Sequence, residues 1–353
     1  MSEKVFVGLS GGVDSAVSAA LLKSQGYDVT GVFIKIWQPE FIECTWKEDR
    51  LDAMRVAAAL GIPFREIDLS EEYKKEVITD MLSNYSKGLT PNPDVLCNQH
   101  IKFGAFLDWA LKEGADMVAT GHYARVRKDG GAYSLLRGKD SHKDQSYFLW
   151  KLDQNALRHT IFPLGEYTKP EVRDLAKRYA LPNAARADSQ GLCFVGDVSV
   201  DEFLARFLPI KEGIVRNAEG KEVGTHRGAI LYTIGQRHGF EVLRGEHVPH
   251  YVVRLDVPKN EIVVSDKKED AAHNELRIKS IHWIVPREIP FSCTAQVRYR
   301  DKALPCMIRA EGDSFIAGFK TPIIVSPGQS LVLYDGDVCL GGGIIVRSVG
   351  WCV

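Results

Sequence analysis

A glycine-rich turn near the start of the chain, SGGVDS at residues 10–15, constrains the fold more than any other segment. An almost wholly apolar run, residues 5–9, precedes it and is typical of a strand buried on both faces of a parallel sheet. Alanines and leucines at helical spacing follow over residues 16–22, with Ser15 placed to cap this helix. A strand, a glycine-rich turn and a helix in this order direct backbone N–H groups and the positive helix end toward one point, where phosphate binds.

This turn differs from two common nucleotide-binding loops. No lysine follows the glycines as G-x-x-x-x-G-K-[ST] requires, and the pattern G-x-G-x-x-G does not fit either. The turn matches SGGxDS, the pyrophosphatase loop of enzymes that split ATP into AMP and pyrophosphate to adenylate an oxygen. On this match, Asp14 is a candidate Mg²⁺ contact or a group that orients a metal-bound water. The alternative is a tight strand–helix turn without a ligand.

Length and composition set the broad class. A chain of 353 residues has room for two or three domains, and it shows neither a signal peptide nor an apolar run long enough to span a membrane. Seven cysteines, an odd number, favour the reducing cytoplasm over a disulfide framework. The formal net charge of -1 does not suggest a nucleic-acid partner, but a basic face can coexist with acidic surface elsewhere.

Strand and helix patterns alternate through the first half of the chain. Buried strands are predicted at residues 29–36, 64–69 and 117–120, helices at 52–60, 72–85 and 103–111, and irregular chain at 39–48. This order is typical of an α/β protein with a doubly wound parallel sheet, whose ligands lie beyond the carboxyl ends of the strands. Gly121 and His122 fall at such an end.

The second half has a different pattern. A hairpin is predicted at residues 124–137 and a helix with a Thr168–Glu171 capping box ends near 179. From about residue 210, short β-type runs replace the helical periodicity, beginning with 229–233, and they indicate small barrels or sandwiches. We therefore expect domains at 1–208, 209–274 and 275–353: the parallel-sheet domain, a small β-rich central domain and a C-terminal β-barrel.

Two of the seven cysteines stand in polar surroundings. Cys97 ends the segment TPNPDVLC, whose prolines and asparagines argue against a regular element up to Asp94, and Cys193 lies in DSQGLCFVG. We expect both in loops, where a thiol is accessible and neighbours can shift its pKa. The other five are expected to be small buried apolar residues, and no C-x₂-C pair indicates structural zinc. These five are Cys44, Cys293, Cys306, Cys339 and Cys352.

In these motifs and several others, the sequence resembles the tRNA-specific 2-thiouridylases, enzymes that place sulfur on the wobble uridine of certain tRNAs. The motifs run in family order over nearly the whole chain. Only the loop around Cys44 departs from the family, because it has fewer cysteines than in many relatives. The motifs are GLSGGVDS (8–15), TPNPDVLCN (90–98), TGHYAR (120–125), KDQSYFL (143–149), DSQGLCFVG (188–196), YTIGQR (232–237) and CLGGGII (339–345).

The resemblance implies roles for individual residues. The phosphates of ATP would be held by Gly8, Leu9, Ser10, Gly11, Gly12, Val13, Asp14 and Ser15, and the adenosine part by Ile34 and Gly121. Substrate contacts would come from Asn92, Pro93, Asp94, His122, Lys143, Asp144, Gln145, Arg298, Tyr299, Arg300 and Gln329. Asp94 would be a general acid or base, Cys97 the nucleophile and Cys193 the carrier of a persulfide.

The implied chemistry explains these residue types. Adenylation by ATP, bound with Mg²⁺, would convert the uridine C2 oxygen into a good leaving group. The persulfide on Cys193 would then attack C2 directly, or Cys97 would first release hydrosulfide; both routes leave a Cys97–Cys193 disulfide. Expected partners are tRNA and a persulfide donor protein, and we expect a monomer in the cytoplasm.

Two other functions remain open on the sequence. A different adenylating ligase with the same loop would use ammonia or an amine as nucleophile and would not need either cysteine. An RNA-binding module with an inactive nucleotide loop would release no pyrophosphate with tRNA.

Overall fold

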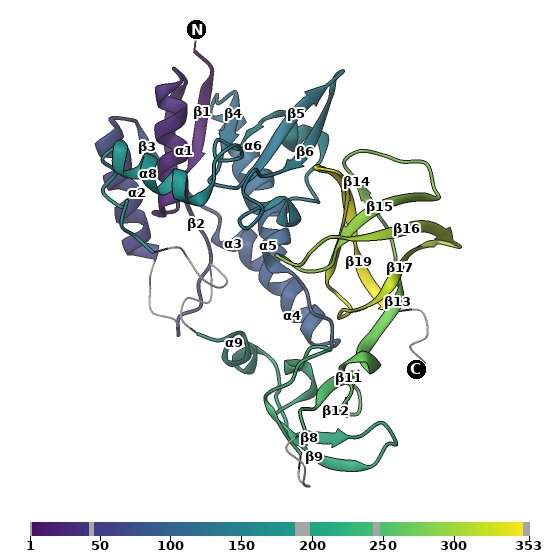
Figure 1. The fold of residues 1–353 in the computed structure, drawn as a ribbon. Coiled ribbons are helices and arrows are strands. Elements are labelled where there is room, and N and C mark those ends of the chain that lie inside the picture. Colours follow the sequence, from purple (N-terminus) through teal and green to yellow (C-terminus); the bar gives the residue numbers. More distant parts are fainter. Residues whose placement is uncertain (1, 42–45, 188–197, 243–247, 349–353) are drawn as a thin grey trace.

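A computed structural model of the chain describes residues 2–41, 46–187, 198–242 and 248–348 (Figure 1). Its first part is built on a five-stranded parallel sheet in the order β3-β2-β1-β4-β7. This sheet confirms the predicted α/β class and doubly wound topology. Its strands are β1 (Lys4–Gly8), β2 (Asp28–Lys35), β3 (Phe64–Asp68), β4 (Met117–Ala119) and β7 (Thr160–Ile161).

Helices cover both faces of this sheet because side chains of β1 alternate between two cores. Val5 and Val7 pack with α1 (Val13–Ser24), α2 (Trp46–Leu60) and α8 (Lys169–Arg178). Phe6, between them, packs against the other face. That face is covered by α3 (Ser70–Tyr73), η1 (Lys74–Ile78), α4 (Thr79–Tyr85), α5 (Pro93–Leu96), the π-helical η2 (Cys97–Ala105) and α6 (Phe106–Lys112).

Three local expectations in this part were wrong. Ser15 does not cap α1: the helix begins at Val13 after Gly12, and Ser15 Oγ donates to the Gly12 carbonyl at 3.1 Å. α2 begins at Trp46 rather than at residue 52, with acidic residues in its first turn that suit the positive helix end. The segment before Cys97 is helical from Pro93, because proline is preorganised for the first helical position.

The central part is a second five-stranded sheet in the order β10-β9-β8-β12-β11. It follows α7 (Gln154–Arg158) and α9 (Val200–Phe207), which begins with a capping box. The strand expected at 229–233 is instead a short 3₁₀ turn, η4 (Ala229–Leu231). The strands are β8 (Gly213–Arg216), β9 (Glu222–His226), β10 (Phe240–Val242), β11 (Tyr251–Asp256) and β12 (Glu261–Ser265).

The third sheet closes into a barrel because β13 pairs with both β17 and β19. The predicted hairpin, β5 (Ala124–Asp129) and β6 (Ala132–Arg137), extends this sheet through β19, so the first part of the chain is joined to the barrel (Figure 1). The domain limits given above stay predictions. Two short 3₁₀ turns, η3 (Ser146–Phe148) and η5 (Lys268–Ala271), precede the barrel in the chain. β14 (His282–Trp283) pairs with β19 outside the closed ring. The strands of the ring are β13 (Ala272–Ile278), β15 (Phe291–Gln296), β16 (Leu304–Glu311), β17 (Ser314–Ile324), β18 (Ser330–Asp335) and β19 (Val338–Ser348).

Among the described residues, no helix is both long enough and apolar enough to cross a bilayer.

Candidate nucleotide and RNA site

The glycine-rich turn joins β1 to α1 at the carboxyl edge of the parallel sheet. Gly11 has φ of 77°, a conformation that side chains disfavour, and its carbonyl accepts a hydrogen bond from Asn183 Nδ2 at 2.7 Å. Ser10 N donates to Ser15 Oγ at 3.2 Å, so the two serines of the motif hold the turn closed around the start of the helix. The residues expected to bind phosphate therefore form one compact loop.

Arg186 fixes this loop from outside and was not identified from the sequence. Its guanidinium donates to the Gly11 carbonyl at 3.3 Å and bonds Asp52 at 2.8 Å, and it also pairs with Asp49. The two aspartates lie in α2, so Arg186 ties the turn to the neighbouring helix. No local pattern marks such a residue, because its partners are more than a hundred positions away.

Asp14 is the acidic residue of the loop, and both its oxygens are engaged. Lys169 Nζ lies 2.7 Å from Oδ1 and 2.9 Å from Oδ2, and Tyr123 Oη donates to Oδ1 at 2.9 Å. Lys169 is the first residue of α8, directly after the predicted Thr168 capping box. Lys169 was not predicted from the sequence, although its place at the start of a predicted helix was a usable signal.

Gly121 follows β4 and lies against the loop. A Cβ at this position would come within 2.8 Å of Ser15 N and 2.9 Å of the Asp14 carbonyl carbon, so only glycine allows this approach. Ile34 is also close, because a Cβ on Gly8 would lie 3.5 Å from its Cδ1. The two residues expected to contact adenosine are thus placed beside the loop.

His122 follows Gly121 at this edge of the sheet and contacts η2, the element that begins at Cys97. Its Nδ1 is 2.7 Å from Thr120 Oγ1, and its ring centroid is 5.8 Å from that of Phe103, which lies in η2. Burial lowers the pKa of His122 well below its ordinary value, and the charge of Lys102 lowers it further. The neutral imidazole therefore links the nucleotide loop to the helix that carries Cys97.

The TPNPDVLCN motif is a helix start rather than a loop. Asn92 Oδ1 accepts hydrogen bonds from the backbone N–H groups of Asp94 at 3.1 Å and Val95 at 3.4 Å. Cys97 is the first residue of η2 and is buried, which corrects the expectation of an accessible loop thiol. Burial raises the pKa of Asp94, and Lys102 opposes this shift. Cys193 lies outside the described residues.

The KDQSYFL motif connects the same region to the barrel. Asp144 is buried, and its carboxylate accepts from Arg137 Nη1 at 2.7 Å and from Gly138 N at 3.0 Å. Gln145 Oε1 accepts from the Tyr123 backbone at 3.0 Å. The expected RNA contact of Asp144 conflicts with this internal bonding, which gives its carboxylate a positioning role.

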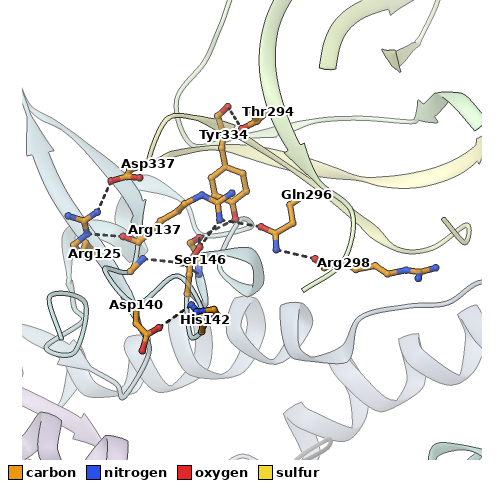
Figure 2. A network of polar contacts seen from close by, with 12 residues as sticks. Arg125, Arg137, Asp140, His142, Ser146, Thr294, Gln296, Arg298, Tyr334 and Asp337 are labelled. Atoms are coloured by element: carbon orange, nitrogen blue, oxygen red, sulfur yellow. Dashed lines mark hydrogen bonds and ion pairs between the residues drawn. The ribbon is translucent and has the colours of Figure 1, made fainter. Parts of the chain in front are cut away.

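Barrel residues meet these motifs directly. The Tyr299 ring centroid is 4.4 Å from that of Phe148, and Phe148 O accepts from Asn98 Nδ2 at 3.2 Å. Thr90 N donates to Pro327 O at 2.7 Å, two residues before Gln329 in the barrel. Figure 2 shows the adjoining polar network, in which Arg298 extends away from the contacts around Ser146. Arg300 is exposed and its guanidinium is 5.2 Å from the Tyr299 ring.

The Tyr299 region of the barrel, the KDQSYFL segment and the start of η2 are therefore in contact with one another. The nucleotide loop lies at the neighbouring sheet edge, and the described ring contact between His122 and Phe103 connects the two.

Comparison with known proteins identifies the family of this chain. Three family models match in order: a tRNA methyl transferase HUP domain at residues 3–197, a tRNA methyl transferase PRC-barrel domain at 201–266 and an aminomethyltransferase beta-barrel domain at 273–345. The tRNA-specific 2-thiouridylase MnmA of Nitrosomonas eutropha is 46% identical, with 98% of this chain and 99% of the relative covered. That of Streptococcus sanguinis is 45% identical, with 98% and 95% covered. The chain therefore belongs to the tRNA-specific 2-thiouridylase family.

Proposed function

We propose that this protein uses ATP to form 2-thiouridine at the wobble position of tRNAs of the Lys, Glu and Gln type. ATP would adenylate the C2 oxygen of the uridine, and a cysteine persulfide would supply the sulfur that displaces AMP. The protein would act in the cytoplasm as a monomer that receives sulfur from a persulfide donor protein.

The observation that carries this proposal is the close approach of Gly121 to the loop, with His122 next to it in contact with the Cys97 helix. An enzyme of this type must activate a carbonyl with nucleotide and attack the same carbon with sulfur, so the two parts must adjoin. The absence of a side chain at Gly121 leaves room beside the loop for the nucleotide, and His122 contacts Phe103 of η2, the element that begins at Cys97 directly after the α5 helix of Asp94.

The nucleotide part depends on charge. Lys169 is positioned beside Asp14 to neutralise phosphate charge once ATP enters the loop. Mg²⁺ bound to ATP typically takes one or two protein carboxylates and completes its shell with phosphate and water. Asp14 is the carboxylate that fits this need, provided that Lys169 shifts to the phosphates, and the ion would there offset charge on the leaving pyrophosphate.

The base would be held by Asn92, Pro93 and Asp94. The raised pKa of Asp94 suits a group that exchanges a proton near the uridine, because such a group works best with a pKa closer to the working pH. A wobble base must turn out of the anticodon stack to reach this position, and Tyr299 and Phe148 offer aromatic faces beside it.

The RNA backbone would contact Lys143, Gln145, Arg298, Arg300 and Gln329. Arg298 Nε is buried without a hydrogen-bond partner in the part of the chain that the structure describes, so this donor suits a phosphate oxygen. Asp144 would act indirectly, by holding Arg137 and the backbone of Gly138.

The sulfur step would use Cys97 and Cys193. Either the Cys193 persulfide attacks C2 and Cys97 closes a disulfide behind it, or Cys97 attacks the persulfide and frees hydrosulfide for the attack. In both cases the two thiols lose two electrons to the transferred sulfur and are restored by a thiol reductant.

A sulfur-transfer assay tests the proposal with the full chain, ATP, unmodified tRNA and a radiolabelled persulfide donor. Wild-type protein should label the tRNA and release pyrophosphate. Cys97→Ser and Cys193→Ser should abolish labelling while they still bind ATP, and Cys293→Ser serves as a matched control. Labelling by either variant would refute the persulfide scheme. Pyrophosphate release with ammonia in place of sulfur would indicate a different ligase, and no release with tRNA an inactive loop.

A further inference from the structure

Two cysteines outside the proposed site face each other across a strand pair in the barrel. Cys293 in β15 is directly opposite Cys306 in β16, and their sulfur atoms are 3.4 Å apart. Both were expected from the sequence to be small buried apolar residues. Cys306 fits that expectation, whereas Cys293 is only half-buried and in direct contact with a second thiol.

The backbone at this pair already satisfies the geometry of a disulfide. Directly opposite residues of an antiparallel pair have Cα atoms about 4.5 or 5.5 Å apart, depending on their hydrogen bonding. A disulfide requires Cα separations of roughly 4.4–6.8 Å. Either register class lies inside this range, so rotation of the two side chains is enough to bring the sulfurs together.

The two thiols differ in exposure and in pKa, and this difference decides which of them reacts first with an oxidant. The hydrogen bond with Cys293 raises the pKa of Cys306, and burial raises it further, so Cys306 is the poorer first nucleophile while this hydrogen bond is in place. Both side chains lie on the face of the strands that packs on the barrel core, and Cys293 is the more exposed of the two. Cys293 is therefore the thiol that a small oxidant meets first.

We propose that Cys293 and Cys306 are a reversible redox site, in which a low-molecular-weight disulfide such as glutathione disulfide converts the thiol pair into a cross-strand disulfide. Cys293 attacks one sulfur of glutathione disulfide, the S–S bond of glutathione disulfide breaks, and the glutathione that is released takes the proton of Cys293. Cys306 then attacks the Cys293 sulfur, forms the internal S–S bond and releases the second glutathione, which takes the proton of Cys306. The protein loses two electrons and glutathione disulfide gains them.

The position of this bond gives it a consequence. The segment between the two cysteines, residues 294–305, contains Arg298, Tyr299 and Arg300. Oxidation closes this segment into a covalent ring, because the disulfide joins the two residues that flank the loop proposed to contact tRNA. The link to tRNA rests on the proposed function, whereas formation of the disulfide does not.

Peptide mapping tests the site in the full chain. The protein is incubated with excess glutathione disulfide, alkylated with iodoacetamide under denaturing conditions and digested. We expect a peptide linked between Cys293 and Cys306 that disappears after dithiothreitol. Only a glutathione adduct on Cys293, or alkylation of both residues, would overturn the proposal.

A thermal measurement provides the second readout. Closing a loop of this length should raise the melting temperature of oxidised wild-type protein by at least ~2 °C over the reduced form. Cys293→Ser and Cys293→Ala should each lose this difference while they retain thiolation in reducing buffer. An equal shift in the variants would contradict the assignment to this pair. Loss of the shift beside intact thiolation separates this site from the proposed Cys97–Cys193 chemistry.

Discussion

Lys169 Nζ lies 2.7 Å from Oδ1 and 2.9 Å from Oδ2 of Asp14, so a residue 155 positions further along the chain neutralises the acidic group of the nucleotide loop. The Lys169 side chain is only 13% exposed, so solvent screens this ion pair little on the side of the lysine. Two charges at this separation in a partly buried site interact by a few kcal/mol, which is enough to decide whether phosphate can approach.

Replacing Lys169 by methionine should weaken ATP binding at least tenfold, because Asp14 would then face the phosphates with its charge uncompensated. Isothermal titration with ATP measures this effect. Lys177→Met is a matched control in the same helix, since its side chain is 73% exposed and far less constrained. Equal ATP affinity in the two variants would contradict a role for Lys169 at the phosphates.

Gly121→Ala should disturb the nucleotide loop through contact alone. The added methyl group would meet Ser15 N at 2.8 Å and the Asp14 Cβ at 3.0 Å, so the loop must shift. We expect ATP affinity to fall by roughly tenfold or more with little change in fold, as overpacking costs about 1–3 kcal/mol. Gly318→Ala is the control, because its nearest contact is Met307 O at 3.9 Å. If both variants bind ATP as wild type does, Gly121 does not adjoin the nucleotide.

Local patterns predicted the parts of the fold whose signals are contiguous. The strand, turn and helix at the N-terminus, the hairpin at 124–137 and the Thr168 capping box all depend on neighbouring residues. Asn92 and Pro93 show how such a signal was misjudged: both also occur in loops, but here they are a helix cap and a first helical residue.

Long-range contacts could not be predicted in the same way. Arg186 binds the Gly11 carbonyl from 175 positions away, and β6 pairs with β19 across some 200 residues. Neither contact leaves a local pattern, because it depends on which elements the folded chain brings together. The site was therefore predicted as a set of motifs, while the residues that hold these motifs in place came only from the structure.

The buried imidazole of His122 should make stability depend on pH. Its folded pKa is well below the unfolded value of 6.5, so below that pH the unfolded chain takes up a proton that the folded chain does not. The contribution of neutral His122 to the free energy of unfolding is thus fully present above pH 6.5. It is lost as the pH falls toward the folded pKa of His122, with a slope of up to about 1.4 kcal/mol per pH unit.

Urea denaturation of wild type and His122→Asn at pH 7.5 and about 5.5 isolates this contribution. Wild type should lose more stability than the variant between the two values. Burial also lowers the pKa of other histidines, which are present in both proteins and cancel in the comparison: His100, His226 and His273. The same loss in both proteins would show that His122 is protonated in the fold.

Arg137 should be the residue on which the junction between the hairpin and the barrel depends most. Its Nη1 bonds Asp144 Oδ2 at 2.7 Å. It also bonds Gln296 Oε1 at 3.2 Å, and its guanidinium lies 3.5 Å from the centre of the Tyr334 ring (Figure 2). The Asp144 side chain is only 7% exposed, so removal of Arg137 leaves a buried charge without its partner.

Arg137→Met should therefore lower the free energy of unfolding by about 3–5 kcal/mol in urea titrations. The double variant with Asp144→Asn should lose less than the sum of the two single changes, because the second change removes the stranded charge. Arg287→Met, whose partner Asp335 has a side chain 66% exposed, should cost at most ~1 kcal/mol. Strict additivity of the Arg137 and Asp144 changes would show that the two side chains do not act together. The link between the KDQSYFL segment and the barrel would then have to come from Tyr147. Its hydroxyl donates to Val297 O and Ser330 O at 3.2 Å.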